Sequence, residues 1–151
     1  MKKLLILIGC ALPTLTFAAN QNTNFNHSGI QKGAISESCY HDPCSVAKVT
    51  NFKQLQKSPE QSLIELTLLG GSKNWKSKKT LWNKSTHKVF ITCSKERPTV
   101  AINGQTTVVP LNPQGVPGVL YSDAELYLKA CHNYEGADTK AAVKFGYNIQ
   151  E

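Results

Sequence analysis

Alternating apolar and polar positions predict a strand in the middle of the chain. In residues 63–69, isoleucine and leucine alternate with glutamate and threonine, which is the pattern of a half-buried strand. The run Ser-Pro-Glu-Gln at 58–61 also satisfies a helix start, and Gly70 and Gly71 would end such a helix. The sequence thus leaves strand or helix open over 59–69. We favour the strand because the alternation is clean and its length suits one.

Several more segments have the composition and alternation of strands. They are 45–55, 79–83, 87–94, 99–102 and 106–109, with a weaker closing strand at 141–147. Residues 84–86 would join the second and third of these segments. Asn103 and Gly104 would form the turn of a hairpin, because both residue types tolerate a positive φ.

One helix is predicted in the C-terminal half of the chain. Ser122 and Glu125 form a capping box, and apolar residues follow at helical spacing, so we expect a helix over 123–132. Asn133 and Gly136 lie beyond its expected end. The fold class is therefore α+β: a mostly antiparallel β-sheet, open or closed into a small barrel, with this helix packed against it.

The first residues have the three parts of a secretory signal peptide. Lys2 and Lys3 precede an apolar run over 4–12, and small residues follow up to Ala18 and Ala19. We predict a signal peptide over 1–19, a flexible polar arm over 20–35 and a single disulfide-containing domain over 36–151. The mature protein would be periplasmic or secreted.

Cys10 offers a second interpretation of this N-terminus. Residues 7–10 look like a lipoprotein cleavage box, which would tether the mature protein through Cys10. The apolar run before Cys10 is short and continues past it, so we favour ordinary cleavage. A membrane is expected as a partner only if Cys10 is lipidated.

Four cysteines remain after processing, which is the even number expected for disulfides in an exported chain. They are Cys39, Cys44, Cys93 and Cys131. Of the three connectivities, we favour one short bridge across a turn and one long bridge from a strand to the helix, pairing the first two and the last two. A zinc site using the first two with His41 is the competing interpretation. Its spacing is unusual, and an oxidising compartment disfavours free thiolates.

Positive charge is concentrated in one segment. The formal net charge of the chain is +7, and removal of residues 1–19 takes away two lysines and leaves +5. Residues 70–84 hold five lysines, both tryptophans and no acid. The proposed anion-binding residues are Lys73, Trp75, Lys76, Lys78, Lys79 and Lys84. The alternative is a solubilising strand edge, with Trp82 in the core.

No catalytic motif was recognised, and no cofactor or metal is expected. The histidines of the mature chain lack an identifiable catalytic partner, and a charged His132 would suit the C-terminal end of the predicted helix. The leading hypothesis is a non-enzymatic exported binding protein, although enzyme activity stays uncertain. Its partner would be an anionic polysaccharide, a lipid, nucleic acid (which no motif supports) or an acidic protein face, and an inhibitor or immunity role fits this class. The alternatives are a small envelope hydrolase with dispersed catalytic residues and a structural envelope component.

Overall fold

The computed structural model describes residues 25–150. The signal peptide predicted for 1–19, Cys10 and the first residues of the expected arm lie outside the described residues. The strands are β1 (Ile35–Ser38), β2 (Cys44–Lys57), β3 (Gln61–Lys73), β4 (Leu81–Ser94), β5 (Thr99–Ile102) and β6 (Gln105–Val108). The helices are η1 (Ser28–Ile30) and η2 (Gly118–Leu120), which are 3₁₀ helices, and α1 (Tyr121–His132) and α2 (Asp138–Phe145).

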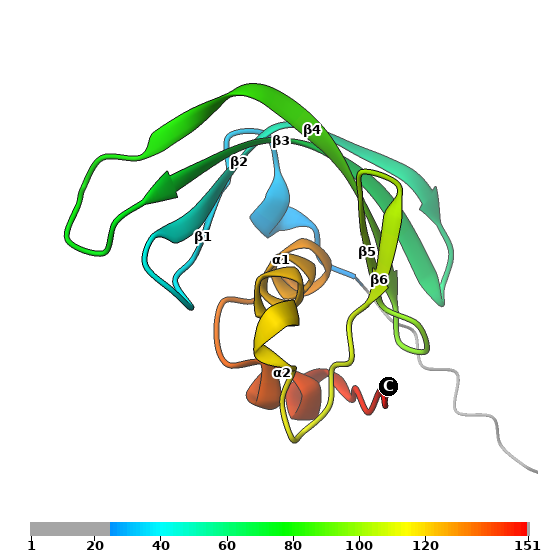
Figure 1. Ribbon diagram of the computed structural model, residues 1–151. Coiled ribbons are helices and arrows are strands. Elements are labelled where there is room, and N and C mark those ends of the chain that lie inside the picture. Colours follow the sequence, from blue (N-terminus) through cyan, green and yellow to red (C-terminus); the bar gives the residue numbers. More distant parts are fainter. Residues whose placement is uncertain (1–24, 151) are drawn as a thin grey trace, which may run out of the picture.

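The six strands form one antiparallel sheet in which neighbours in sequence are neighbours in space. The sheet curves around α1, and α2 lies on the side of α1 away from the sheet (Figure 1). β1 and β6 are the two edges of this sheet, so it is open and does not close into the small barrel considered above. The α+β class with a mostly antiparallel sheet is confirmed.

The core lies between the concave face of the sheet and α1. Alternate residues of the long strands point inward, and Ile64, Leu66 and Ile91 are fully buried. They belong to one cluster with Tyr127 and Leu128 of α1. The strand over 63–69 is thus confirmed. The run at 58–61 forms the turn that precedes it, and no helix begins there.

β4 is a single strand, although two strands at 79–83 and 87–94 were expected. Leu69 pairs with Thr86 and Gly71 pairs with Trp82, so three residues of β4, 83–85, lie opposite Gly70 alone. The polar residues that suggested a turn therefore form a bulge, which bends a strand without ending it. The turn at Asn103 and Gly104 is confirmed, with φ of 52° and 81°.

The closing strand expected over 141–147 is wrong, because these residues begin inside α2. Ala141 and Ala142 are both fully buried, which an alternating strand would not allow. Alanine is the strongest helix former, Asp138 lies in the first turn, and Gly146 ends the helix at φ 71°. These helix-forming signals decide the conformation of the segment, and the weak alternation of apolar and polar residues does not.

α1 begins at Tyr121, two residues before the predicted start, and its N-terminus has no side-chain cap. The expected capping box does not form because η2 runs directly into α1 and places Ser122 inside the first turn. The Ser122 hydroxyl instead lies 3.1 Å from the Ser38 hydroxyl. Asn133 ends the helix in the left-handed conformation, as expected.

The described part of the expected arm, 25–35, packs against the domain. Ile30 is fully buried in the core, and Phe25 packs against it. The backbone N–H of Asn26 donates to the carbonyl of Cys131 at 2.8 Å. A few apolar side chains in a polar stretch and this hydrogen bond thus hold the segment against the domain, and average composition gives no sign of them.

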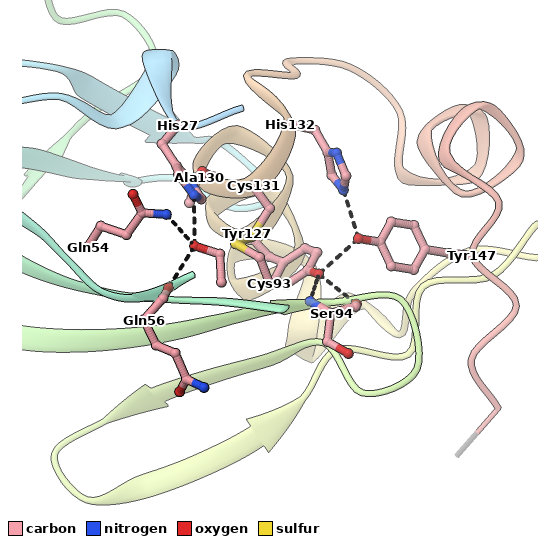
Figure 2. Close-up of a disulfide and its surroundings, with 11 residues drawn as sticks. His27, Gln54, Gln56, Cys93, Ser94, Tyr127, Ala130, Cys131, His132 and Tyr147 are labelled. Atoms are coloured by element: carbon pink, nitrogen blue, oxygen red, sulfur yellow. Dashed lines mark hydrogen bonds between the residues drawn. A yellow bond between two sulfur atoms is a disulfide. The ribbon is translucent and has the colours of Figure 1, made fainter. Parts of the chain in front are cut away.

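Both favoured disulfides are present, Cys39–Cys44 and Cys93–Cys131. The second joins β4 to α1 at the centre of the core (Figure 2). Two disulfides indicate a protein that folds outside the reducing cytosol. Among the described residues, none of the helices has both the length and the apolar character needed to cross a bilayer.

The two bridges should differ in their contribution to stability. Replacing Cys93 and Cys131 together with alanine should lower the free energy of unfolding by about 4 kcal/mol, because this bridge closes a long loop. The control pair, Cys39→Ala with Cys44→Ala, should cost only about 2 kcal/mol. Urea unfolding of both double variants measures the difference, and equal losses would contradict the role given to the long bridge.

Candidate functional site

The lysine- and tryptophan-rich segment forms the end of the β3–β4 hairpin. We call residues 73–84 the hairpin end. It comprises the last residue of β3, the connection over 74–80 and the first residues of β4. This connection projects away from α1 and α2, at the far end of the paired strands β3 and β4 (Figure 1). The hairpin end therefore stands out from the core.

Three large apolar side chains of the hairpin end are exposed to solvent. Trp75 is 61% exposed, Leu81 65% and Trp82 39%. Trp82 is not a core residue, which was the alternative considered for it. Gly71 faces it across the ladder, and a Cβ at Gly71 would lie 3.0 Å from the indole atom Cε3. The indole thus lies close against the glycine backbone and leaves much of its surface uncovered.

Four of the predicted lysines present free ammonium groups. Lys76, Lys78, Lys79 and Lys84 are exposed, and none of them forms an ion pair with another described residue. Lys73 differs from them because its ammonium forms an ion pair with Glu37 of β1, and its side chain is 22% exposed. Lys73 is therefore already matched within the protein.

The short disulfide loop is attached to the hairpin end. The backbone N–H of Trp75 donates to the Asp42 carboxylate at 3.0 Å, and Cys44 pairs with Lys73 in the ladder. The loop thus holds the start of the connection and places one acid beside it. These two contacts join residues 33 and 29 positions apart, and no local signal in the sequence indicated them.

A cleft between the sheet and α1 brings a histidine and several acids together. His87 from β4 and the carboxylates of Asp123 and Glu125 from α1 line the same cleft. Within residues 25–150, His87 has no hydrogen bond that would orient its ring. Among the described residues, the cleft therefore shows no hydrogen-bonded histidine–carboxylate pair.

A second group of polar side chains is buried beside the long disulfide (Figure 2). The Tyr127 hydroxyl accepts from the backbone N–H of Ser94 at 3.1 Å and donates to its carbonyl at 3.0 Å. It also lies 2.9 Å from the Tyr147 hydroxyl, which is 2.7 Å from Nε2 of His132. This network links β4, α1 and the C-terminal segment.

His132 is neutral at physiological pH, contrary to the charged helix end that was expected. Burial lowers its pKa to about 3, and the nearby positive charges of Lys95 and His27 act in the same direction. The ring also stacks on Phe145 at a centroid distance of 4.0 Å. Because a neutral ring loses little on burial, the core tolerates it where an imidazolium would be costly.

Lys95 is the remaining polar group of this region. Burial lowers its pKa to about 8. Its ammonium donates to the carbonyl of Phe145 and lies 4.2 Å from the ring centroid of Tyr147. These contacts tie the turn after β4 to the C-terminal segment, so we assign Lys95 a structural role.

Among the described residues, one group of three side chains lies close enough together to be considered as metal ligands, namely Glu37, Cys39 and Cys44. Its two sulfur atoms are joined in a disulfide, so neither can act as a thiolate ligand.

No family model, curated protein or solved structure matches this chain.

The neutral state of His132 should make stability depend on pH. The unfolded chain binds a proton at His132 as the pH falls below about 6.5, whereas the folded protein binds it only near 3. The free energy of unfolding should therefore decrease as the pH falls from 6.5 to 5, with His132 contributing about 1 kcal/mol per pH unit.

Urea unfolding at several pH values checks this effect. His132→Gln should flatten the dependence over that range, whatever its effect on stability at neutral pH. The control His87→Gln removes a histidine that forms no hydrogen bond with the other described residues, and it should keep the wild-type slope. Equal slopes for the wild type and His132→Gln would contradict a neutral, buried His132.

Proposed function

We propose that this chain is a non-enzymatic exported binding protein of the cell envelope, periplasmic or secreted, whose hairpin end attaches to an anionic partner. One observation carries the proposal: three exposed apolar side chains lie in the same short segment as four ammonium groups that have no ion pair in the described part of the chain. A concentrated positive charge attracts an anionic surface, and the apolar side chains can then bury area against it.

The alternative of a solubilising strand edge explains the exposed lysines of the hairpin end but not its exposed apolar side chains. Lysines protect an exposed edge from aggregation, but Trp75 and Leu81 expose apolar surface that would favour aggregation. Burying one such side chain against a partner contributes about 1.5–3 kcal/mol. The combination therefore supports a contact surface more strongly than a solvated face.

Among anionic partners, the side chains favour lipid head groups, such as lipopolysaccharide or an anionic phospholipid. Tryptophan prefers the boundary between head groups and acyl chains, and lysines near it interact with phosphates. Leu81 is aliphatic and 65% exposed, so it suits an acyl boundary better than the stacked bases of a nucleic acid. A polysaccharide, a nucleic acid and an acidic protein face are the competing partners.

The hydrolase alternative lacks comparable support. A triad-type hydrolase uses a histidine held by a partner near a nucleophile, and His87 has no such hydrogen bond within the described residues. His132 is bonded to Tyr147 and stacked on Phe145 inside the core. The binding role is therefore the one that we propose.

The hairpin end can be tested by its own fluorescence, because both tryptophans of the chain, Trp75 and Trp82, lie in it. Vesicles of phosphatidylglycerol mixed with phosphatidylcholine should shift the emission to shorter wavelength, and pure phosphatidylcholine should not. Changing Lys76, Lys78 and Lys79 together to alanine should weaken binding about 100-fold, since each lysine near an anionic surface contributes about 1 kcal/mol.

A matched control removes the same number of positive charges from a different part of the protein. Lys48, Lys53 and Lys57 are three exposed lysines of β2, and replacing them with alanine should weaken vesicle binding far less. An equal loss in both triple variants would mean that net charge acts and the hairpin end does not. Tighter binding to heparin or single-stranded DNA than to vesicles would reject the lipid as the partner but keep the anion site.

A further inference from the structure

The cleft between the sheet and α1 has a chemistry opposite to that of the hairpin end. It has a volume of about 680 Å³, which is in the range of small-molecule sites. Its sheet side carries small residues, among them Ser45, Ala47 and Gly70. Because these side chains do not reach across to α1, the curvature of the sheet leaves a cleft there.

Part of the cleft wall is apolar. Ile102 from the sheet, Leu126 from α1 and Tyr134 just after α1 line the cleft, and all three side chains are partly exposed. A ligand that enters the cleft can therefore bury an apolar body against these side chains. Burial of that kind is the main favourable contribution in most small-molecule sites.

Two buried polar atoms in this cleft lack a hydrogen-bond partner. They are Oγ of Ser36 and Oε2 of Glu125, and residues 25–150 contain no other buried side-chain oxygen or nitrogen in this state. Both residues line the cleft. A buried polar atom without a partner is costly, so its occurrence needs an explanation. Tyr121 already forms a side-chain hydrogen bond with the Glu125 carboxylate. An ionised carboxylate oxygen can only accept, so Oε2 of Glu125 still requires a donor.

The charges of the cleft show which donor fits. Of its four carboxylates, Glu37 is paired with Lys73 and Glu135 with Lys129. Asp123 and Glu125 have no cationic partner in the described part of the chain. Burial raises the pKa of Asp123, and a bound cation would relieve this cost. The unpaired charge in the cleft is therefore negative.

We propose that the cleft binds a small organic cation, consisting of an ammonium group on an apolar body. The ammonium group donates to Oε2 of Glu125, and the apolar body packs on Leu126 and Tyr134. A hydrated metal ion fits less well, because it requires a shell of oxygen ligands where this cleft supplies apolar walls. Asn83 borders both regions, but the groups that would hold the cation are not the lysines and exposed apolar side chains of the hairpin end, so the proposal does not depend on the proposed function.

Three probes with the same apolar body and different head groups test this proposal. Hexylamine, hexanol and hexanoate are titrated into the mature protein, and backbone amide shifts are followed by NMR. Hexylamine, protonated at neutral pH, should bind at least tenfold more tightly than hexanol, and hexanoate should bind weakest. The shifts should lie in β1–β4 and α1 around the cleft. Equal affinity for hexylamine and hexanol, or shifts elsewhere, would overturn the proposal.

Variants separate the carboxylate from general charge. Glu125→Gln should remove the tenfold preference for hexylamine and leave hexanol binding unchanged. Glu96→Gln removes the same charge from an exposed residue outside the cleft and should keep the preference. An equal effect of both variants would contradict the role of Glu125.

A second variant serves if Glu125→Gln fails to fold. Ala47→Leu should fill the cleft and abolish binding of hexylamine and hexanol alike. Vesicle binding through the hairpin end should remain, so failure of this proposal and failure of the proposed function are distinguishable. Full hexylamine binding by Ala47→Leu would overturn the assignment of the cleft.

Discussion

The arrangement of the whole chain depends on how α1 packs into the concave face of the sheet. An open, strongly curved sheet cannot bury its inner face by itself, and α1 supplies the missing layer. The long disulfide and the hydrogen bonds of Tyr127 hold α1 against β4 at one place, in the middle of the core. Both ends of the longest strands can then extend past the helix without losing their support.

The two proposed sites follow from this packing. Where the sheet carries large side chains, α1 and the strands form a dry core. Where it carries small ones, the same curvature leaves the cleft. Farther along β3 and β4, no helix covers the strands, and the hairpin end meets solvent on its own. Along the paired strands β3 and β4, the core, the cleft and the hairpin end thus follow one another.

Local sequence signals predicted those features that depend on neighbouring residues. The turn at Asn103 and Gly104 follows from φ preferences, and the alternation over 63–69 matches inward-facing residues of β3. The signals failed where tertiary contacts decide. β4 continues through a polar stretch because β3 pairs on both sides of it, and α2 forms because its two buried alanines fit against the core.

The candidate sites show the same division. Composition identified the lysines and tryptophans of the hairpin end, because they are consecutive in sequence. It missed that Lys73 is paired with Glu37 and that Asp42 holds Trp75, because these contacts join distant segments. The cleft gave no signal at all. Its wall is assembled from β1 to β4 and α1, mostly from small or apolar residues that are unremarkable one by one.

The bulge in β4 has a consequence for how this hairpin can vary. It adds two residues to β4 relative to β3, and an even number preserves the alternation of side chains between the two faces. Asn83 and His87 therefore both line the cleft, whereas Trp82, directly before Asn83, points to the other face. Pairs of residues can be gained or lost here without exchanging inside for outside, but a single insertion would turn the indole inward.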